Sequence, residues 1–87
     1  MNKMPEQISE VDAVINHLSE IHEDTTVPRN VRLQIQNAVG TLKEEAELLI
    51  KVNKVLNELD EIARDTNLQS YTRIQIWNVM SVLEKLQ

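Results

Sequence analysis

Two histidines are the side chains best suited to metal binding or acid–base chemistry in this sequence of 87 residues. His17 and His22 lie five positions apart, so on a helix they would point about 140° away from each other. Helical zinc sites use histidines four positions apart and di-iron bundles use Glu-x-x-His pairs, and neither pattern occurs. We expect His22 to be partly buried and hydrogen-bonded, and His17 to face solvent. Neither is predicted to be catalytic.

Carboxylates are the second group that could do chemistry. They gather in three short runs, but no Asp-x-Asp-x-Asp-Gly loop organises them into a cation site. Runs of like charge usually form a solvated face, so the sequence predicts no metal site, no cofactor and no catalytic residue. The runs are Glu20-Glu23-Asp24, Glu44-Glu45-Glu47 and Glu58-Asp60-Glu61.

The composition excludes further classes of function. The chain has no Cys, which excludes disulfides, thiolate metal sites and cysteine nucleophiles, and its single Gly cannot build a phosphate-cradling loop. A net charge of −5 repels phosphate backbones, so nucleic acid is not the expected partner. No apolar run approaches the ~20 residues of a membrane span, and no signal-peptide pattern is present. We expect a cytoplasmic protein that is not an enzyme.

An internal repeat points to a different set of polar residues. Residues 11–44 align without a gap with residues 52–85, and thirteen of the aligned positions are identical. Polar residues kept in both copies suggest a shared structural task, such as an Arg–Asp contact that fixes the loop between two helices. The candidate structural pairs are Asp24 with Asp65, Arg32 with Arg73, and Asn37 with Asn78. A functional alternative is that Arg29, Asn30 and Arg32 bind an anion or a partner at the end of that loop.

Trp77 departs from the repeat, because the aligned residue is Gln36. At 100° per residue, Ile74 and Trp77 lie on a helix face distinct from the apolar stripe that contains Ile76. This second face predicts either deeper burial or an interface with a partner, for which Trp is a frequent anchor. The alternative is that Trp77 closes the edge of the fold together with Tyr71.

The elements that position these residues follow from apolar spacing. Apolar residues recur at steps of three and four between residues 8 and 21, 31 and 42, 48 and 62, and 76 and 83, which predicts four helices. Short connections make neighbouring helices antiparallel. The sequence therefore predicts an all-α, up-and-down four-helix bundle in one domain, residues 1–87, built from two repeated helical hairpins at about 5–44 and 46–86.

The helix boundaries are predicted from local signals. Pro5 and Pro28 suit first helical turns, and Thr26 and Asn67 could cap the helices that follow them. The boundary at residues 42–47 has no helix breaker, although the repeat places a new helix start near residue 46. A continuous helix over about residues 29–62 is the alternative, and it would favour a domain-swapped dimer.

Two stretches resemble a known family. The Asp-Thr-Thr-Val-Pro-Arg-Asn-Val-Arg segment over residues 24–32 and the Arg-Ile-Gln-Ile-Trp-Asn run over 73–78 resemble the archaeal Uncharacterised Protein Family 0147, and the likeness covers nearly the whole chain. The resemblance implies a short four-helix bundle of archaeal origin and implies no activity. It draws attention to Val27, Pro28, Arg29, Asn30 and Arg32 as a structural or recognition element.

The leading hypothesis is a non-catalytic interaction module that binds another protein, or a second copy of itself, through the face with Ile74 and Trp77. The alternative is an RNA- or ribonucleoprotein-associated adaptor that uses Arg29, Asn30 and Arg32. An enzyme ranks third, because the serines and histidines assemble no nucleophile set.

Overall fold

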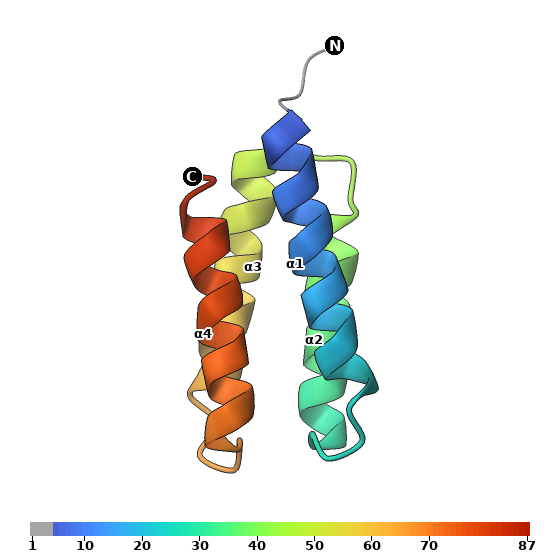
Figure 1. Cartoon of the computed structure of the whole chain (residues 1–87), viewed down its shortest axis with the longest axis vertical. Helices are drawn as coiled ribbons and strands as arrows, with labels where there is room; N and C mark the ends of the chain where they lie inside the picture. Colours follow the sequence, from blue (N-terminus) through green and yellow to red (C-terminus); the bar gives the residue numbers. More distant parts are fainter. Residues whose placement is uncertain (1–4) are drawn as a thin grey trace.

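Four helices form the molecule. A computed structural model describes residues 5–87, with the side chains of residues 10–87. The helices are α1 (Pro5–Glu23), α2 (Arg29–Leu42), α3 (Leu48–Ala63) and α4 (Ser70–Glu84). Each packs against the next along the chain, and α4 also packs against α1, so the four surround one core. The result is an elongated all-α bundle of 42 × 19 × 18 Å in which successive helices run in opposite directions (Figure 1).

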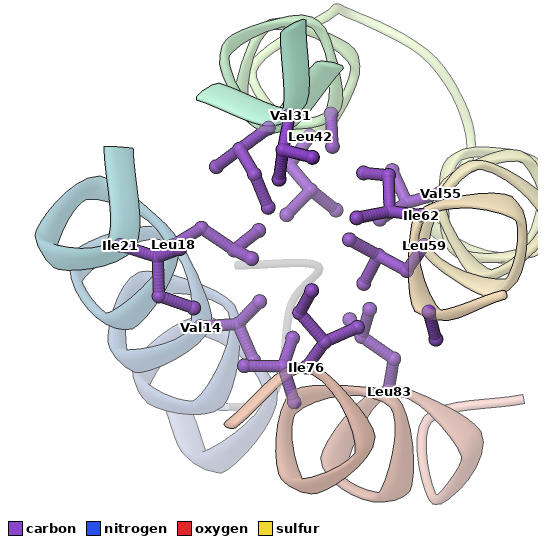
Figure 2. Packing of buried hydrophobic residues seen from close by; sticks show 14 of the residues in the cluster. Val14, Leu18, Ile21, Val31, Leu42, Val55, Leu59, Ile62, Ile76 and Leu83 are labelled. Carbon is purple, nitrogen blue, oxygen red and sulfur yellow. The ribbon is translucent and has the colours of Figure 1, made fainter. Parts of the chain in front are cut away.

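The core is aliphatic, and it comes from the predicted stripes. Each helix contributes at least one fully buried large side chain, and the apolar side chains of all four helices converge on the bundle axis (Figure 2). Burying one such side chain stabilises the fold by about 1.5–3 kcal/mol. Of the apolar residues predicted to lie on these stripes, Leu49 is exposed, and Ile8 lies outside the described side chains. The fully buried examples are Leu18, Ile35, Leu59 and Ile76.

Residues 43–47 form a connection, so the continuous helix does not occur. α2 ends at Leu42, and α3 begins at Leu48, two residues after the start predicted near residue 46. Lys51 provides the physical reason, because its ammonium donates hydrogen bonds of 3.1 Å to the carbonyls of Leu42 and Glu44. Leu42 is the last residue of α2, where carbonyls have no intrahelical donor and a cation is favourable, whereas Glu44 lies in the connection and its carbonyl also accepts the Ala46 N–H. Lys51 is only 9% exposed, so it stabilises the connection from the buried side of α3.

The predicted capping residues do not cap. The residues immediately before α2 and α4 are Pro28 and Gln69, and neither side chain bonds to its helix. Pro28 therefore lies just before the first turn rather than within it, and its carbonyl accepts the first hydrogen bond of α2. The backbone N–H groups of Thr26 and Asn67 donate to a carboxylate of their own loop instead.

Candidate functional site

Each hairpin loop is shaped by the aspartate that was predicted to have a structural role. The Asp24 Oδ1 atom accepts hydrogen bonds from the Thr26 N–H at 2.9 Å and from the Thr26 hydroxyl at 2.7 Å. The Asp65 Oδ1 atom accepts the Asn67 N–H at 2.9 Å. The Thr26 hydroxyl, followed by its N–H, lowers the pKa of Asp24 from its ordinary value of 3.8, and Arg32 adds a smaller effect in the same direction. Both loops are thus folded by a carboxylate that receives donors from two residues ahead.

The predicted contact between Arg32 and Asp24 does not form as an ion pair. Arg32 is half-buried, and its Nε donates to the carbonyl of Val27 at 3.1 Å. Thr26 donates to Asp24 Oδ1, and the Val27 carbonyl, which has no backbone donor among the described residues, accepts the Arg32 Nε–H instead. Arg32 therefore stabilises the loop through its backbone.

Arg73 does the same more extensively. Its Nε donates to the carbonyl of Ala63 at 2.8 Å, and its Nη2 donates to the carbonyls of Asp65 and Leu68 at 2.8 and 3.2 Å. These three oxygens run from the end of α3 to the end of the following loop. One guanidinium on α4 therefore joins α3, the loop and α4, without an ion pair to Asp65.

The two asparagines do not form a structural pair. Asn37 and Asn78 are exposed, and neither side chain makes a hydrogen bond to a described residue. Asn37 borders an open hollow of about 190 Å³ between α2 and α3, together with Gln34, Glu58 and Glu61. Within the described side chains the Glu58 Oε1 atom is buried and has no hydrogen-bond partner. The hollow is lined by carboxylates and amides and gives no sign of a specific ligand.

The histidines are similar to each other in their environment. Both His17 and His22 are half-buried, so the expectation that His17 faces solvent was wrong. His22 is partly buried as predicted, but its ring makes no hydrogen bond to the described side chains. Among residues whose side chains are described, no group of three His, Asp or Glu side chains could hold a metal ion.

Of the three residues predicted to bind a partner at the end of the first loop, two have exposed side chains. Arg29 and Asn30 are exposed at the start of α2, whereas Arg32 is engaged with Val27. Val27 is itself part of the core. The structure brings these residues to one end of the bundle, where two of the three predicted interaction side chains are free to meet a partner.

The outer side of α4 exposes large apolar side chains. Ile74 is 52% exposed and Trp77 is 53% exposed, and Tyr71 is also exposed. Trp77 therefore does not close the edge of the bundle with Tyr71 and is not deeply buried. Below, "the α4 face" means the exposed surface formed by Ile74 and Trp77, with Ser70 and Ser81 at its ends.

Sequence reasoning missed Lys51, a residue important for the fold. It lies three residues after Leu48 and four residues before Val55 of the apolar stripe, so a helical projection places it on the core side. That signal was available, because a lysine next to a stripe must find backbone or carboxylate partners when buried. Leu33 and Ile50 were also not predicted as exposed apolar residues.

Comparison with known proteins gives relatives along the whole chain. The model of an uncharacterised protein family, UPF0147, matches residues 1–86. The crystal structure of a protein of unknown function, MMP1188, is 38% identical, with a TM-score of 0.88 over 100% of this chain and 98% of that one. A UPF0147 protein from Thermoplasma acidophilum is 35% identical, with a TM-score of 0.86 over 91% of this chain and 94% of that one. No match was found among curated proteins.

Proposed function

Because the chain belongs to the uncharacterised protein family UPF0147, whose description assigns no activity, we propose a function from the surface of the molecule itself. The protein is a non-catalytic interaction module of the cytoplasm, and its docking surface is the α4 face. No helix in the part of the chain that the structure describes is long and apolar enough to cross a membrane. The observation that carries the proposal is the half-exposed Trp77 beside the half-exposed Ile74.

The buried aliphatic core does not include Trp77. The core is closed by fully buried aliphatic residues from all four helices, and the indole lies outside it. A tryptophan buries about 150–250 Å² when covered, so covering its exposed half would contribute about 2–3 kcal/mol. Tryptophan is enriched among the few residues that dominate binding energy. An exposed tryptophan that packing does not require is therefore best explained by a partner.

The repeat supports the same proposal. We infer that the two hairpins are copies of one unit, because identical residues occupy aligned positions and both loops are folded by an aspartate. At the aligned positions, α2 has Leu33 and Gln36 where α4 has Ile74 and Trp77. The aromatic anchor belongs to the second copy alone, as expected for a surface that gained its own role.

The test is affinity capture of the tagged full chain from its native extract, with partners identified by mass spectrometry. We expect Trp77→Ala to remove a stoichiometric partner. Leu33→Ala is the control for loss of an exposed apolar side chain, because Leu33 is 50% exposed at the place on α2 that aligns with Ile74, and it should leave the complex intact. Equal recovery of every partner by Trp77→Ala and the unmodified chain would refute a role for the α4 face.

A second candidate function is an RNA- or ribonucleoprotein-associated adaptor. Its support is the exposure of Arg29 and Asn30 at the start of α2. It is weaker because Arg32 bonds to the loop and the net charge is −5. It predicts RNA binding that falls steeply with salt and is reduced by Arg29→Glu. Binding that is absent, or indifferent to salt, would exclude it.

A further inference from the structure

The α4 face has the spacing of a helix–helix seam. Ser70, Ile74, Trp77 and Ser81 follow one another at alternating steps of four and three residues, which aligns them along one side of the helix. All four are exposed. In the described chain α4 packs against α3 and α1, and about half of the surface of Ile74 and Trp77 stays exposed. α4 thus has a packing stripe in addition to the one that it turns to the core.

The charge distribution makes this seam suitable for a contact between two copies of the chain. From Ser70 to Leu83, α4 has one charged residue, Arg73, and its guanidinium is bonded to the loop carbonyls. The net charge of −5 makes two copies of the chain repel each other, so copies must meet where carboxylates are absent. The outer side of α2 is likewise uncharged from Leu33 to Leu42, but it lacks an aromatic anchor. Of these two uncharged surfaces, the α4 face has the larger apolar content.

Resting on the function proposed above, we propose that the α4 face binds the α4 face of a second copy of this chain, antiparallel and about a twofold axis between Trp77 and Asn78. This arrangement places Ile74 of one copy against Ser81 of the other, and the same contact repeats on the far side of the axis. A large side chain then meets a small one twice, as ridges-into-grooves packing requires. The two indole rings lie near the axis.

The Ser81 hydroxyl of the seam is compatible with being covered. The Ser81 hydroxyl donates to the carbonyl of Trp77 at 3.1 Å, so covering it leaves no donor without a partner. Antiparallel pairing also takes Glu84 to the start of the other copy's α4, where the helix dipole favours a negative charge. Parallel pairing would place Glu84 against Glu84 and is therefore disfavoured.

The size of the seam sets the expected strength. A helix of 15 residues is about 22 Å long, and one seam of that length covers a few hundred Å² per copy. A standard stable interface covers roughly 800 Å² per partner. We therefore expect a weak and reversible dimer with a dissociation constant on the order of 100 µM.

The first arm of the test is sedimentation equilibrium of the full chain from about 10 µM to about 1 mM, a range that brackets this constant. Trp77→Ala should weaken self-association at least tenfold, as expected for a central anchor. Leu33→Ala should leave it unchanged, with circular dichroism confirming that both variants are folded. A monomer at every concentration would overturn the proposal, and so would equal weakening by Leu33→Ala, which would indicate an α4–α2 contact.

The second arm tests the orientation. The chain has no cysteine, so a single introduced cysteine can form a disulfide only with the same cysteine of the second copy. Asn78→Cys lies beside the axis and should form a disulfide-linked dimer on mild oxidation. Ser70→Cys residues would be about 22 Å apart and should not cross-link. Cross-linking through Ser70→Cys would overturn the antiparallel dimer. A monomer whose capture of a different protein still depends on Trp77 would overturn this dimer and leave the proposed function standing.

Discussion

Replacing Arg73 by methionine should destabilise the protein far more than the same change at Arg32. Both arginines are half-buried at aligned positions of the two hairpins. Arg73 donates to three backbone carbonyls, whereas Arg32 donates to one. Methionine keeps most of the apolar stem of arginine, so the comparison isolates the hydrogen bonds.

The magnitude follows from the number of bonds. A hydrogen bond with a charged donor contributes about 1.5–3 kcal/mol, and partial exposure to water reduces this to about 1 kcal/mol per bond here. Arg73→Met should therefore lower the free energy of unfolding by about 3 kcal/mol, and Arg32→Met by about 1 kcal/mol. A small domain has a stability of about 5–15 kcal/mol, so both variants should remain folded at 25 °C.

Urea unfolding followed by circular dichroism gives both values by linear extrapolation. The two variants should have the same m-value as the unmodified chain, because they expose the same surface on unfolding. Equal losses at the two positions would refute the reasoning. So would a loss below about 0.5 kcal/mol for Arg73→Met, since that is the size of an ordinary surface substitution.

Three further predictions use the same architecture. Lys51→Met leaves the Leu42 carbonyl at the end of α2 without a donor and removes one of the two donors to the Glu44 carbonyl, so it should lower the free energy of unfolding by about 1–3 kcal/mol. It should also speed hydrogen exchange in residues 43–47, and unchanged exchange there would count against the role given to Lys51. Gly40→Ala should raise stability by about 0.5–1 kcal/mol in thermal melts, because Gly40 is helical and an added Cβ meets nothing within 4 Å; a lower melting temperature would contradict this. The Asp24 carboxyl should titrate below 3.8 in NMR, and Thr26→Val should raise its pKa. Because the pKa of Asp24 is lower in the folded state than in the unfolded state, its ionised form stabilises the fold above the unfolded pKa. That contribution to stability is lost as the pH falls through the folded pKa.

The sequence predicted the four helices and their aliphatic core because apolar spacing reports directly on which side of a helix is buried. It misplaced details that depend on where backbone carbonyls find donors. Lys51 donates to two carbonyls of the α2–α3 connection. The spacing of residue types in the sequence does not indicate that its ammonium lies within hydrogen-bond distance of those carbonyls.

The candidate site shows the same division. The type and place of Trp77 already indicated a second face on its helix, and the structure shows that this face is exposed. The aspartates and arginines were correctly linked to the hairpin loops, but their partners were not. Asp24 accepts hydrogen bonds from Thr26, and Arg32 donates to the Val27 carbonyl, because the loop geometry brings this carbonyl within reach of the guanidinium, and the residue types do not state that geometry.

The contact between α1 and α4 has a consequence for folding kinetics. Three of the four helix–helix contacts join neighbours in the chain, and only this fourth contact joins its two ends (Figure 1). Such local contacts are typical of helical bundles that fold in microseconds to milliseconds. Since α1 begins and α4 ends at the same end of the bundle, a short linker could join them while the exposed connection at residues 43–47 is cut. In such a circularly permuted chain the contact between α1 and α4 would join neighbours in sequence, and the contact between α2 and α3 would join the two ends of the chain. The number of distant contacts would stay the same, so the folding rate should change little.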